Sequence, residues 1–300
     1  MPLVQLKNRW WQVSIDTDKG GSIMEGHCYS TRDASFRHAL GVNGPVDAST
    51  TLPPPIGFLM LPFCNRIDRG KFTFDGRSIV FPINRTDQDV AIHGLSRDLP
   101  WRIVASSDSE LRLEQTVEHG VTPYRYRATL SYRLEQEKFV SALQVTQLAA
   151  QVLPYGMGFH PWFAVSDDAS ISFSARTYLD LDKRGLPLQP AAFSTPNQRF
   201  VRKENLGMDR YFHGWNGSAT ITDPAWGGSL TVTGTGSMTN LHTFISPVWR
   251  AMAVEPVTNA PAVLNRRDLA AYGDMRPLAQ NESLAGEMGM RWLPDDEDPA

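Results

Sequence analysis

Three ionisable side chains stand in segments that otherwise have the composition of buried sheet. They are His93, His160 and Glu255, and each has apolar residues, proline or glycine on both sides. Burying an unpaired charge costs several kcal/mol, so each side chain should be paired, face a cavity or be neutral. Together they predict a cleft that holds an acid and a base. Taken alone, each also fits a satisfied core residue, because perturbed groups serve structure as well.

The chain lacks the motifs of several common enzyme classes. There is no GxGxxG after a strand, no GxxxxGK[ST] loop, no HExxH and no GxSxG elbow. Nucleotide-dependent, zinc-peptidase and serine-hydrolase chemistry therefore have no support. The nearest approach to a glycine loop, Gly234-Thr235-Gly236-Ser237, follows a Thr-rich segment, and we expect a hairpin connection there rather than a phosphate site.

Composition and charge narrow the class of partner. The 300 residues contain 29 Lys and Arg against 32 Asp and Glu, for a net charge of -3, and the basic residues are scattered. Nucleic acid is not an expected partner. Residues 1–16 have no apolar segment of signal-peptide length, and the apolar stretch Ile56–Phe63 is far shorter than the ~18 residues that span a bilayer. We expect a cytoplasmic protein without membrane contact.

The two cysteines, Cys28 and Cys64, form no CxxC pair. Two cysteines in a chain of this length argue against a disulfide framework and against a structural zinc site. We expect free thiols and no bound metal.

The elements that must position these residues are strands. Apolar residues alternate with polar ones over 111–117, 124–134 and 139–145, which predicts three successive antiparallel strands. Residues 71–80 form a predicted hairpin, because Asp75-Gly76 supplies the positive φ angles of a type I′ turn. The alternation returns at 218–222 and 229–233, and no apolar stripe of helical period is sustained. The fold class is all-β.

So many strands must stack or close to hide their edges, which predicts a large antiparallel β-sandwich or super-sandwich. A chain of 300 residues can form two ordinary domains or one large all-β unit. We favour a single domain over residues 1–293. Residues 294–300 are rich in Asp and Glu and are expected to form a solvated acidic tail.

Several short segments follow one another along the chain in a specific order. They are Leu6-Lys7-Asn8, Gly20-Gly21-Ser22-Ile23, Asn65-Arg66-Ile67, Gly70-Lys71-Phe72, Asp75-Gly76, Ile83-Asn84, Ile92-His93-Gly94, His160-Pro161-Trp162-Phe163, Met208-Asp209-Arg210-Tyr211-Phe212, Val254-Glu255-Pro256, Pro277-Leu278-Ala279 and Glu282-Ser283. In this order they resemble the aldose 1-epimerase (galactose mutarotase-like) family, as in its shorter bacterial paralogues. The resemblance covers nearly the whole chain and selects the same three residues as the burial argument.

The resemblance implies a β-super-sandwich that interconverts the α and β anomers of a free aldose without cofactor or metal. Glu255 resembles the family's base, which takes the proton of the anomeric hydroxyl. His160 resembles its acid, which protonates the ring oxygen, and a histidine that titrates near neutrality suits that role. We expect the two groups to face each other across one sugar. His93, the third member of the catalytic set, and Arg66 resemble residues that hydrogen-bond the ring-oxygen side and neighbouring hydroxyls.

Further residues are expected to bind the sugar. Asp209 resembles the carboxylate that accepts hydrogen bonds from hydroxyls, and Asn65 adjoins Arg66 in the first signature. Trp162 offers an aromatic face, as Phe163 and Trp249 also do, although core packing suits at least one of the three. The expected partner is a small-molecule sugar, an aldohexose or an aldopentose, bound by a monomer or a homodimer.

Two other functions stay open. A mutarotase for hexose 6-phosphates would need basic side chains gathered around a dianion, and the candidates are Arg66, Arg69, Arg97 and Arg125. A sugar-binding or regulatory β-sandwich would keep the groove and lose the chemistry. The presence of both histidines and the glutamate argues against that second function.

Overall fold

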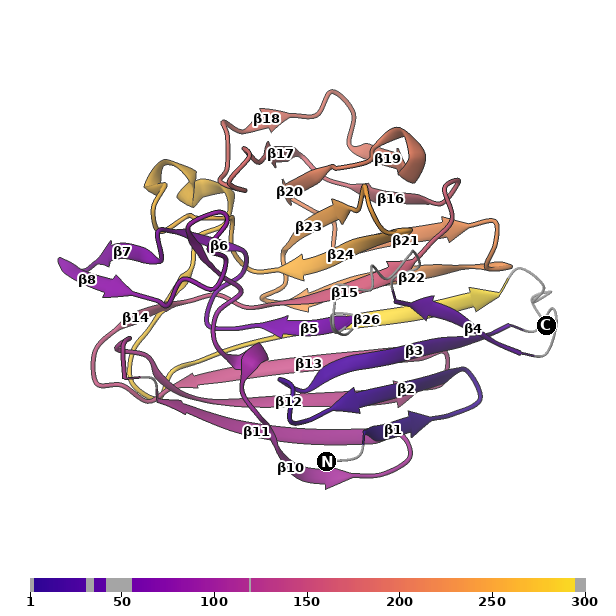
Figure 1. Cartoon of the computed structure of the whole chain (residues 1–300), viewed down its shortest axis with the longest axis horizontal. Coiled ribbons are helices and arrows are strands. Elements are labelled where there is room, and N and C mark those ends of the chain that lie inside the picture. The colour runs from indigo at the N-terminus through magenta and orange to yellow at the C-terminus, as the bar shows by residue number, and fades with distance from the viewer. Residues whose placement is uncertain (1–2, 31–34, 42–55, 119, 295–300) are drawn as a thin grey trace.

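Two large antiparallel sheets lie face to face in the computed structural model of the protein (Figure 1). The structure describes residues 3–30, 35–41, 56–118 and 120–294. This arrangement confirms the predicted all-β sandwich. The described residues contain three short 3-10 helices and no α-helix, and none of these helices is long and apolar enough to cross a membrane.

The first sheet has eleven strands in the order β1-β2-β3-β4-β15-β24-β23-β20-β17-β18, with β5 paired to β15 and β3. Its strands are β1 (Val4–Lys7), β2 (Trp11–Asp16), β3 (Ser22–Ser30), β4 (Ser35–Leu40), β5 (Gly57–Met60), β15 (Gly158–Ala164), β17 (Thr177–Asp180), β18 (Ala191–Ala192), β20 (Asp209–His213), β23 (Asn240–Ile245) and β24 (Ala251–Val257). This sheet carries the candidate site.

The second sheet has nine strands in the order β10-β11-β12-β13-β26-β22-β21-β16-β19. Its strands are β10 (Arg102–Ser106), β11 (Glu110–Glu118), β12 (Arg125–Glu135), β13 (Lys138–Gln147), β16 (Ser170–Ser174), β19 (Asn197–Val201), β21 (Ser218–Asp223), β22 (Gly228–Gly236) and β26 (Ser283–Pro294). It supports the first sheet from behind.

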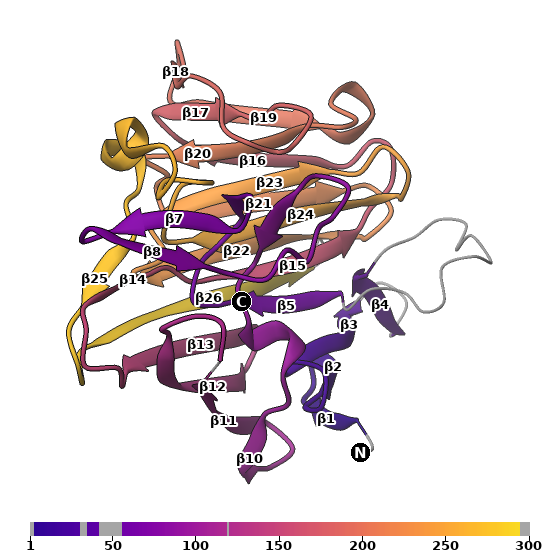
Figure 2. The same ribbon diagram turned by 60° about the vertical axis from the view of Figure 1, so that its left-hand side comes forward.

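Smaller elements flank the two sheets, several of them at the end that carries the hairpin β7–β8. In Figures 1 and 2 the hairpin β7–β8 lies on the same side of the molecule as the gold segment that carries η3. Asn265 ties the two together, because its side chain donates to the Lys71 carbonyl at 2.7 Å. These elements are β6 (Arg66–Asp68), β7 (Lys71–Phe74), β8 (Arg77–Val80), β9 (Val90–Ile92), β14 (Leu153–Tyr155), β25 (Arg276–Leu278), η1 (Ser96–Asp98), η2 (Arg202–Glu204) and η3 (Arg267–Tyr272).

The core lies between the two sheets. Trp11 of the first sheet packs against Phe139 of the second, with ring centroids 5.8 Å apart. The Tyr132 hydroxyl donates to the Gly21 carbonyl at 2.7 Å and so joins the sheets through a polar contact. Period-two alternation places such residues inside and their neighbours outside, as the buried-exposed pattern along β12 shows.

The structure confirms the three predicted successive strands, which are β11, β12 and β13 in one continuous antiparallel ladder. It also confirms the hairpin β7–β8, where Asp75 and Gly76 have φ angles of 49° and 71°. The free thiols of Cys28 and Cys64 are both buried.

One local prediction was wrong. The segment expected as a hairpin connection, 234–237, instead extends β22 to Gly236, which pairs with Gly286 of β26. The chain then passes to β23 in the other sheet. Of the predicted acidic tail, only Pro294 is described, at the end of β26, and the division into one domain over 1–293 stays a prediction.

Candidate active site

Three ionisable residues of the site form one row across the first sheet together with Phe58. Phe58 of β5 pairs with His160 of β15, and the register of β15 with β24 puts His160 opposite Glu255. His242 of β23 pairs with Glu255 from the other side. Paired residues point to the same face of a sheet, so strand register alone brings these four side chains together. This face is turned away from the second sheet. Side chains alternate along β15, and Phe159 and Phe163, which point to the opposite face from His160, lie in the core between the sheets.

A second row lies two residues along the same strands. Here Trp162 pairs with Ala253, Ala253 with Phe244, and Phe244 with Asp209. Trp162 also meets Trp249 edge to face, with ring centroids 5.8 Å apart. The rings of Trp162 and Phe244 meet edge to face across the small, fully buried Ala253, with centroids 5.7 Å apart. The second row therefore offers a mostly aromatic surface beside the ionisable one.

Glu255 and His160 contact each other directly. Nε2 of His160 lies 3.2 Å from Oε1 of Glu255, and only 2% of Glu255 is exposed. Burial raises the pKa of Glu255 to about 8 against the opposing effect of His242. Burial lowers the pKa of His160 to about 3, and His242 adds to this effect. At neutral pH the pair therefore holds one proton, on the carboxyl group.

This geometry differs from the sequence expectation in two respects. The acid and base candidates lie side by side on neighbouring strands rather than on opposite sides of a sugar. His160 alone does not titrate near neutrality, because its ring is buried and stacks on Phe58 at 4.4 Å between centroids. The proton that either group would transfer belongs to the pair.

A second ionic group flanks the row. Nε2 of His242 lies 2.6 Å from Oδ1 of Asp209, and Oδ2 of Asp209 lies 3.7 Å from Nη2 of Arg66. Burial opposes the charge of His242, but the neighbouring Glu255 and Asp209 outweigh burial and raise the pKa of the imidazole. Burial likewise opposes the charge of Asp209, while His242 and Arg66 outweigh it and lower the pKa of Asp209. Both shifts favour the charged forms of His242 and Asp209, and we call His242, Asp209 and Arg66 the ion triad.

His93 and Asn65 form a wall above the row. Both have left-handed backbone angles, with φ of 62° and 59°, and the amide of His93 donates to the Asn65 carbonyl at 2.9 Å. Such angles are uncommon outside glycine but are tolerated by Asn and His. They direct the His93 ring to within 5.3 Å of the His160 ring. Burial lowers the pKa of His93 well below its usual range, with His160 contributing, so His93 is a neutral imidazole.

Arg66 is fixed on several sides. Its Nε donates to Gln88 at 3.0 Å and its Nη1 to Asn65 at 3.1 Å. A Cβ atom on Gly185 would lie 2.2 Å from Cζ of Arg66, so glycine is needed where this loop crosses the guanidinium. The side-chain oxygen of Asn65 therefore holds Arg66 in place, and no local sequence pattern predicted the contact with Gly185.

A polar hollow of about 520 Å³ opens beside the second row. Asp209 and Phe244 line it from the sheet, and Gln88 and Gly185 line it from the wall around Arg66. The loops at 180–183 and 205–208 form its outer rim. The site is therefore open to solvent on the side of Asp209.

Three histidine nitrogens in the site have no hydrogen-bond partner within the part of the chain that the structure describes. They are the buried Nδ1 atoms of His93, His160 and His242. Buried polar atoms are usually satisfied, so unsatisfied ones in a cleft suit the hydroxyls of a ligand. Among the described residues, no three His, Cys, Asp or Glu side chains gather as a metal site would require.

The structure brings all the predicted site residues to one region, but with unequal exposure. His93, His160, Glu255, Arg66, Asn65, Asp209 and Trp162 all lie in or beside the two rows. Phe163 instead faces the core and is fully buried. Sequence reasoning missed His242, although it stands in the apolar segment Asn240-Leu241-His242-Thr243-Phe244, where the burial argument applies equally.

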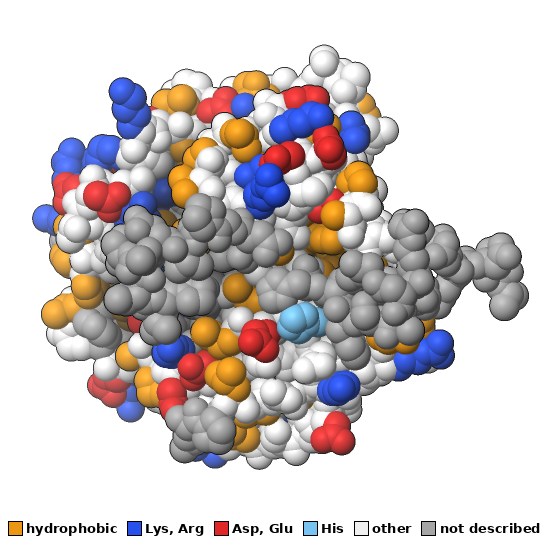
Figure 3. Space-filling view, turned by 45° about the vertical axis from the view of Figure 1, so that its right-hand side comes forward, with side chains coloured by type: hydrophobic (Ala, Val, Ile, Leu, Met, Phe, Trp, Pro, Cys, Tyr) orange, Lys and Arg blue, Asp and Glu red, His pale blue; other side chains and the backbone are white. Residues whose placement is uncertain are grey.

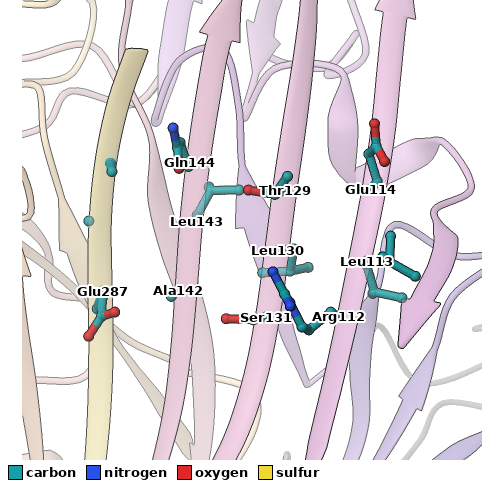
Figure 4. A pocket seen from close by; sticks show the side chains of 13 residues that line it. Arg112, Leu113, Glu114, Thr129, Leu130, Ser131, Ala142, Leu143, Gln144 and Glu287 are labelled. Atoms are coloured by element: carbon teal, nitrogen blue, oxygen red, sulfur yellow. The ribbon is translucent and has the colours of Figure 1, made fainter. Parts of the chain in front are cut away.

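A second hollow lies elsewhere, on the outer face of the nine-stranded sheet. It has a volume of about 390 Å³, and Figure 4 shows Arg112 and Glu114 of β11 beside Ser131 of β12 and Glu287 of β26. Arg102 pairs with Glu114 at 2.6 Å and Arg133 with Glu287 at 3.6 Å. On the face in Figure 3, basic and acidic side chains are likewise interspersed.

Comparisons with known proteins identify relatives of this chain. The family model described as aldose 1-epimerase matches residues 38–286. The uncharacterised protein YphB of Escherichia coli K12 is 29% identical over 298 residues, which cover 94% of this chain and 97% of that protein.

Solved structures show the same fold. An Escherichia coli K12 protein provisionally described as an aldose 1-epimerase superimposes with a TM-score of 0.81 and 25% identity, covering 97% of this chain and 98% of that one. A GalM/aldose epimerase homologue from C. elegans gives a TM-score of 0.79 at 12% identity, with the same shares of the two chains covered.

Proposed function

The chain belongs to the aldose 1-epimerase family, and on that premise we propose that it interconverts the α and β anomers of a free aldose. The observation that carries the proposal is the contact between Glu255 and His160, in a row whose neighbour Asp209 lines a polar hollow of about 520 Å³. Ring opening removes a proton from the anomeric hydroxyl and delivers one to the ring oxygen. Both oxygens are bonded to the anomeric carbon, so a donor and an acceptor 3.2 Å apart can serve them together.

The proton count of the pair fits this reaction. The neutral pair has its proton on Glu255, and transfer along the existing contact gives a Glu255 carboxylate and a His160 imidazolium without any exchange with solvent. In this form Glu255 takes the hydroxyl proton and His160 protonates the ring oxygen. The open aldehyde then rotates about its C1–C2 bond, and the two groups exchange roles as the ring closes. Each turnover thus leaves the pair with one proton.

The remaining residues bind and orient the sugar in this proposal. His93 lies close enough to His160 to donate to the ring-oxygen side, and Arg66 and Asp209 face the hydroxyls. The second row, with Trp162 and Phe244, supports an apolar face of the ring. Asn65 holds Arg66 in place through its side-chain oxygen.

A neutral sugar fits the site better than a sugar phosphate. Arg66 is paired with Asp209, Arg97 with Asp98 at 3.3 Å, and Arg125 with Glu118 at 3.4 Å. A phosphate dianion would have to compete with carboxylates for these cations. We therefore favour an unphosphorylated aldohexose or aldopentose as substrate.

Polarimetry of freshly dissolved α-glucose, α-galactose and α-arabinose, with and without the protein, tests the proposal. We expect the protein to accelerate mutarotation of at least one sugar, and the Glu255→Gln variant to lose that acceleration. Glucose 6-phosphate should be a poorer substrate than the best neutral sugar. Binding of a sugar without acceleration of its mutarotation would indicate a sugar-binding protein instead.

A further inference from the structure

His242 takes no part in the proton transfers proposed above, yet it is the neighbour of the base on the strand opposite to that of His160. It is the cross-strand partner of Glu255, so the two Cβ atoms are about 4.5–5.5 Å apart. Its side chain is 4% exposed, and its Nε2 contacts Asp209 at 2.6 Å. One ring nitrogen of this buried histidine contacts a carboxylate, and a second carboxyl group lies beside the ring. These surroundings favour the positively charged form of the imidazole.

Among the other groups around Glu255, Arg66 also favours the carboxylate form, but its effect on the pKa of Glu255 is smaller than that of His242. His160 of β15 shares its proton with Glu255, and His93 is a neutral imidazole behind it. Arg66 of β6 is already bound to Asp209, Asn65 and Gln88. The charged and titratable groups that act on Glu255, His242 or His160 are Cys64, Arg66, His93, Arg97, His160, Asp209, His242 and Glu255.

Asp209 explains how the charge is held. Its two oxygens divide between His242 and Arg66, so it anchors the imidazolium at a fixed distance from the row while it remains 27% exposed toward the polar hollow. A hydrogen bond between two ionised groups is roughly twice as strong as a neutral one. The anchored imidazolium therefore faces Glu255 with little freedom to turn away.

We propose that His242 is a positioning residue for the base: anchored by Asp209, its imidazolium stabilises the carboxylate form of Glu255 and with it the reactive form of the Glu255–His160 pair. The inference rests on the proposed function for its kinetic consequence only. Without this cation, the proton of the pair would remain more firmly on Glu255, and the form that can accept the hydroxyl proton would be rarer. His242 thereby acts through Glu255 and not on the sugar's reacting atoms.

The decisive experiment measures Glu255 directly in the full-length, substrate-free protein. Glutamate labelled with ¹³C at the side-chain carboxyl carbon is titrated by NMR, and Glu255→Gln identifies the signal. His242→Gln keeps a donor for Asp209 but removes the charge, and should raise the titration midpoint of Glu255 by about one to two pH units. His242→Lys restores a cation and should return the midpoint toward the wild-type value. His213→Gln makes the same substitution on β20, outside the row, as the matched control.

Two further measurements keep the outcome clear. In ¹⁵N-histidine-labelled wild-type protein, both ring nitrogens of His242 should be protonated at pH 7, and a neutral ring would overturn the inference even if no variant folded. In the mutarotase assay at pH 7, His242→Gln should lower kcat/KM by roughly ten- to a hundredfold, in line with the shift of Glu255. An unchanged Glu255 midpoint in His242→Gln refutes the positioning role. Absence of mutarotase activity in the wild type refutes the proposed function, while the NMR titration still decides the charge relation.

Discussion

Replacing Glu255 by glutamine removes the proposed base. It should also make the protein more stable than the wild type, by a difference in unfolding free energy that grows as the pH rises. Burial raises the pKa of Glu255 from its ordinary 4.5 to about 8. In the unfolded chain this carboxyl group ionises near 4.5, so between pH 4.5 and 8 the native state holds a proton that the unfolded state has lost. A pKa raised by folding contributes stability at low pH that disappears as the pH rises through the folded value.

The magnitude follows from the two pKa values. Each pH unit of displacement corresponds to about 1.4 kcal/mol, so the rise to about 8 amounts to about 5 kcal/mol in all. Between pH 5 and pH 8 the wild type should lose about 3–4 kcal/mol of unfolding free energy through this group. Glu255→Gln keeps the shape, and its amide can donate to His160, but it has no proton to lose. Its advantage over the wild type should therefore grow by that amount.

Urea unfolding of both proteins at pH 5, 6, 7 and 8, followed by tryptophan fluorescence, measures the difference. Glu118→Gln, at an exposed position of β11, makes the same chemical change away from the site and is the matched control. A difference between wild type and Glu255→Gln that stays constant from pH 5 to pH 8 would show that burial does not disfavour the Glu255 carboxylate. The reasoning would fail equally if Glu255→Gln lost ground as the pH rose.

Four further predictions concern activity. Glu255→Gln and His160→Ala should each lower kcat by roughly 10²–10⁴-fold with the fold intact, and near-wild-type turnover in either would contradict their roles. The pH profile of kcat/KM should be bell-shaped with limbs near 3 and 8, because the singly protonated Glu255–His160 pair is the active form; a single rising limb would contradict this. If His160 belongs to that pair, His160→Asn should abolish the bell while His93→Asn keeps it, and the opposite result would exchange their roles. Asp209→Asn should raise KM by roughly ten- to a hundredfold, the worth of about 1.5–3 kcal/mol of charge-assisted hydrogen bonding, and it should also lower kcat because it removes the anchor of the His242 imidazolium; an unchanged KM would contradict a direct contact between Asp209 and the sugar.

The sequence predicted those parts of the fold that depend on local patterns, namely individual strands and tight turns. Period-two alternation predicted β11, β12 and β13, and Asp75-Gly76 predicted the hairpin β7–β8. It failed at 234–237, because a glycine-rich segment has no side chains to show which way it faces. There the choice between turning and continuing is made by β26, some fifty residues later, which pairs with β22 as far as Gly236.

For the site, residue type was more informative than spacing. A charge in an apolar strand marked His160 and Glu255, and the same rule would have found His242 had it been applied to 240–244. The direct contact of His160 with Glu255 depends on the register of β15 against β24, which no local pattern specifies. The close packing of Gly185 on Arg66 was beyond sequence reasoning as well, since a loop glycine has many explanations.

Because the row is built from several strands of the first sheet, the proposed activity would also indicate when those strands have reached their final pairing. Its members come from positions 58, 160, 242 and 255, and a slip of β24 by one residue would turn Glu255 into the core between the sheets. Pairings between such distant segments are the slow steps in forming β proteins. During refolding, secondary structure can therefore return while the row is still unassembled. The return of catalysis would mark the moment when the central strands of the first sheet reach their final register.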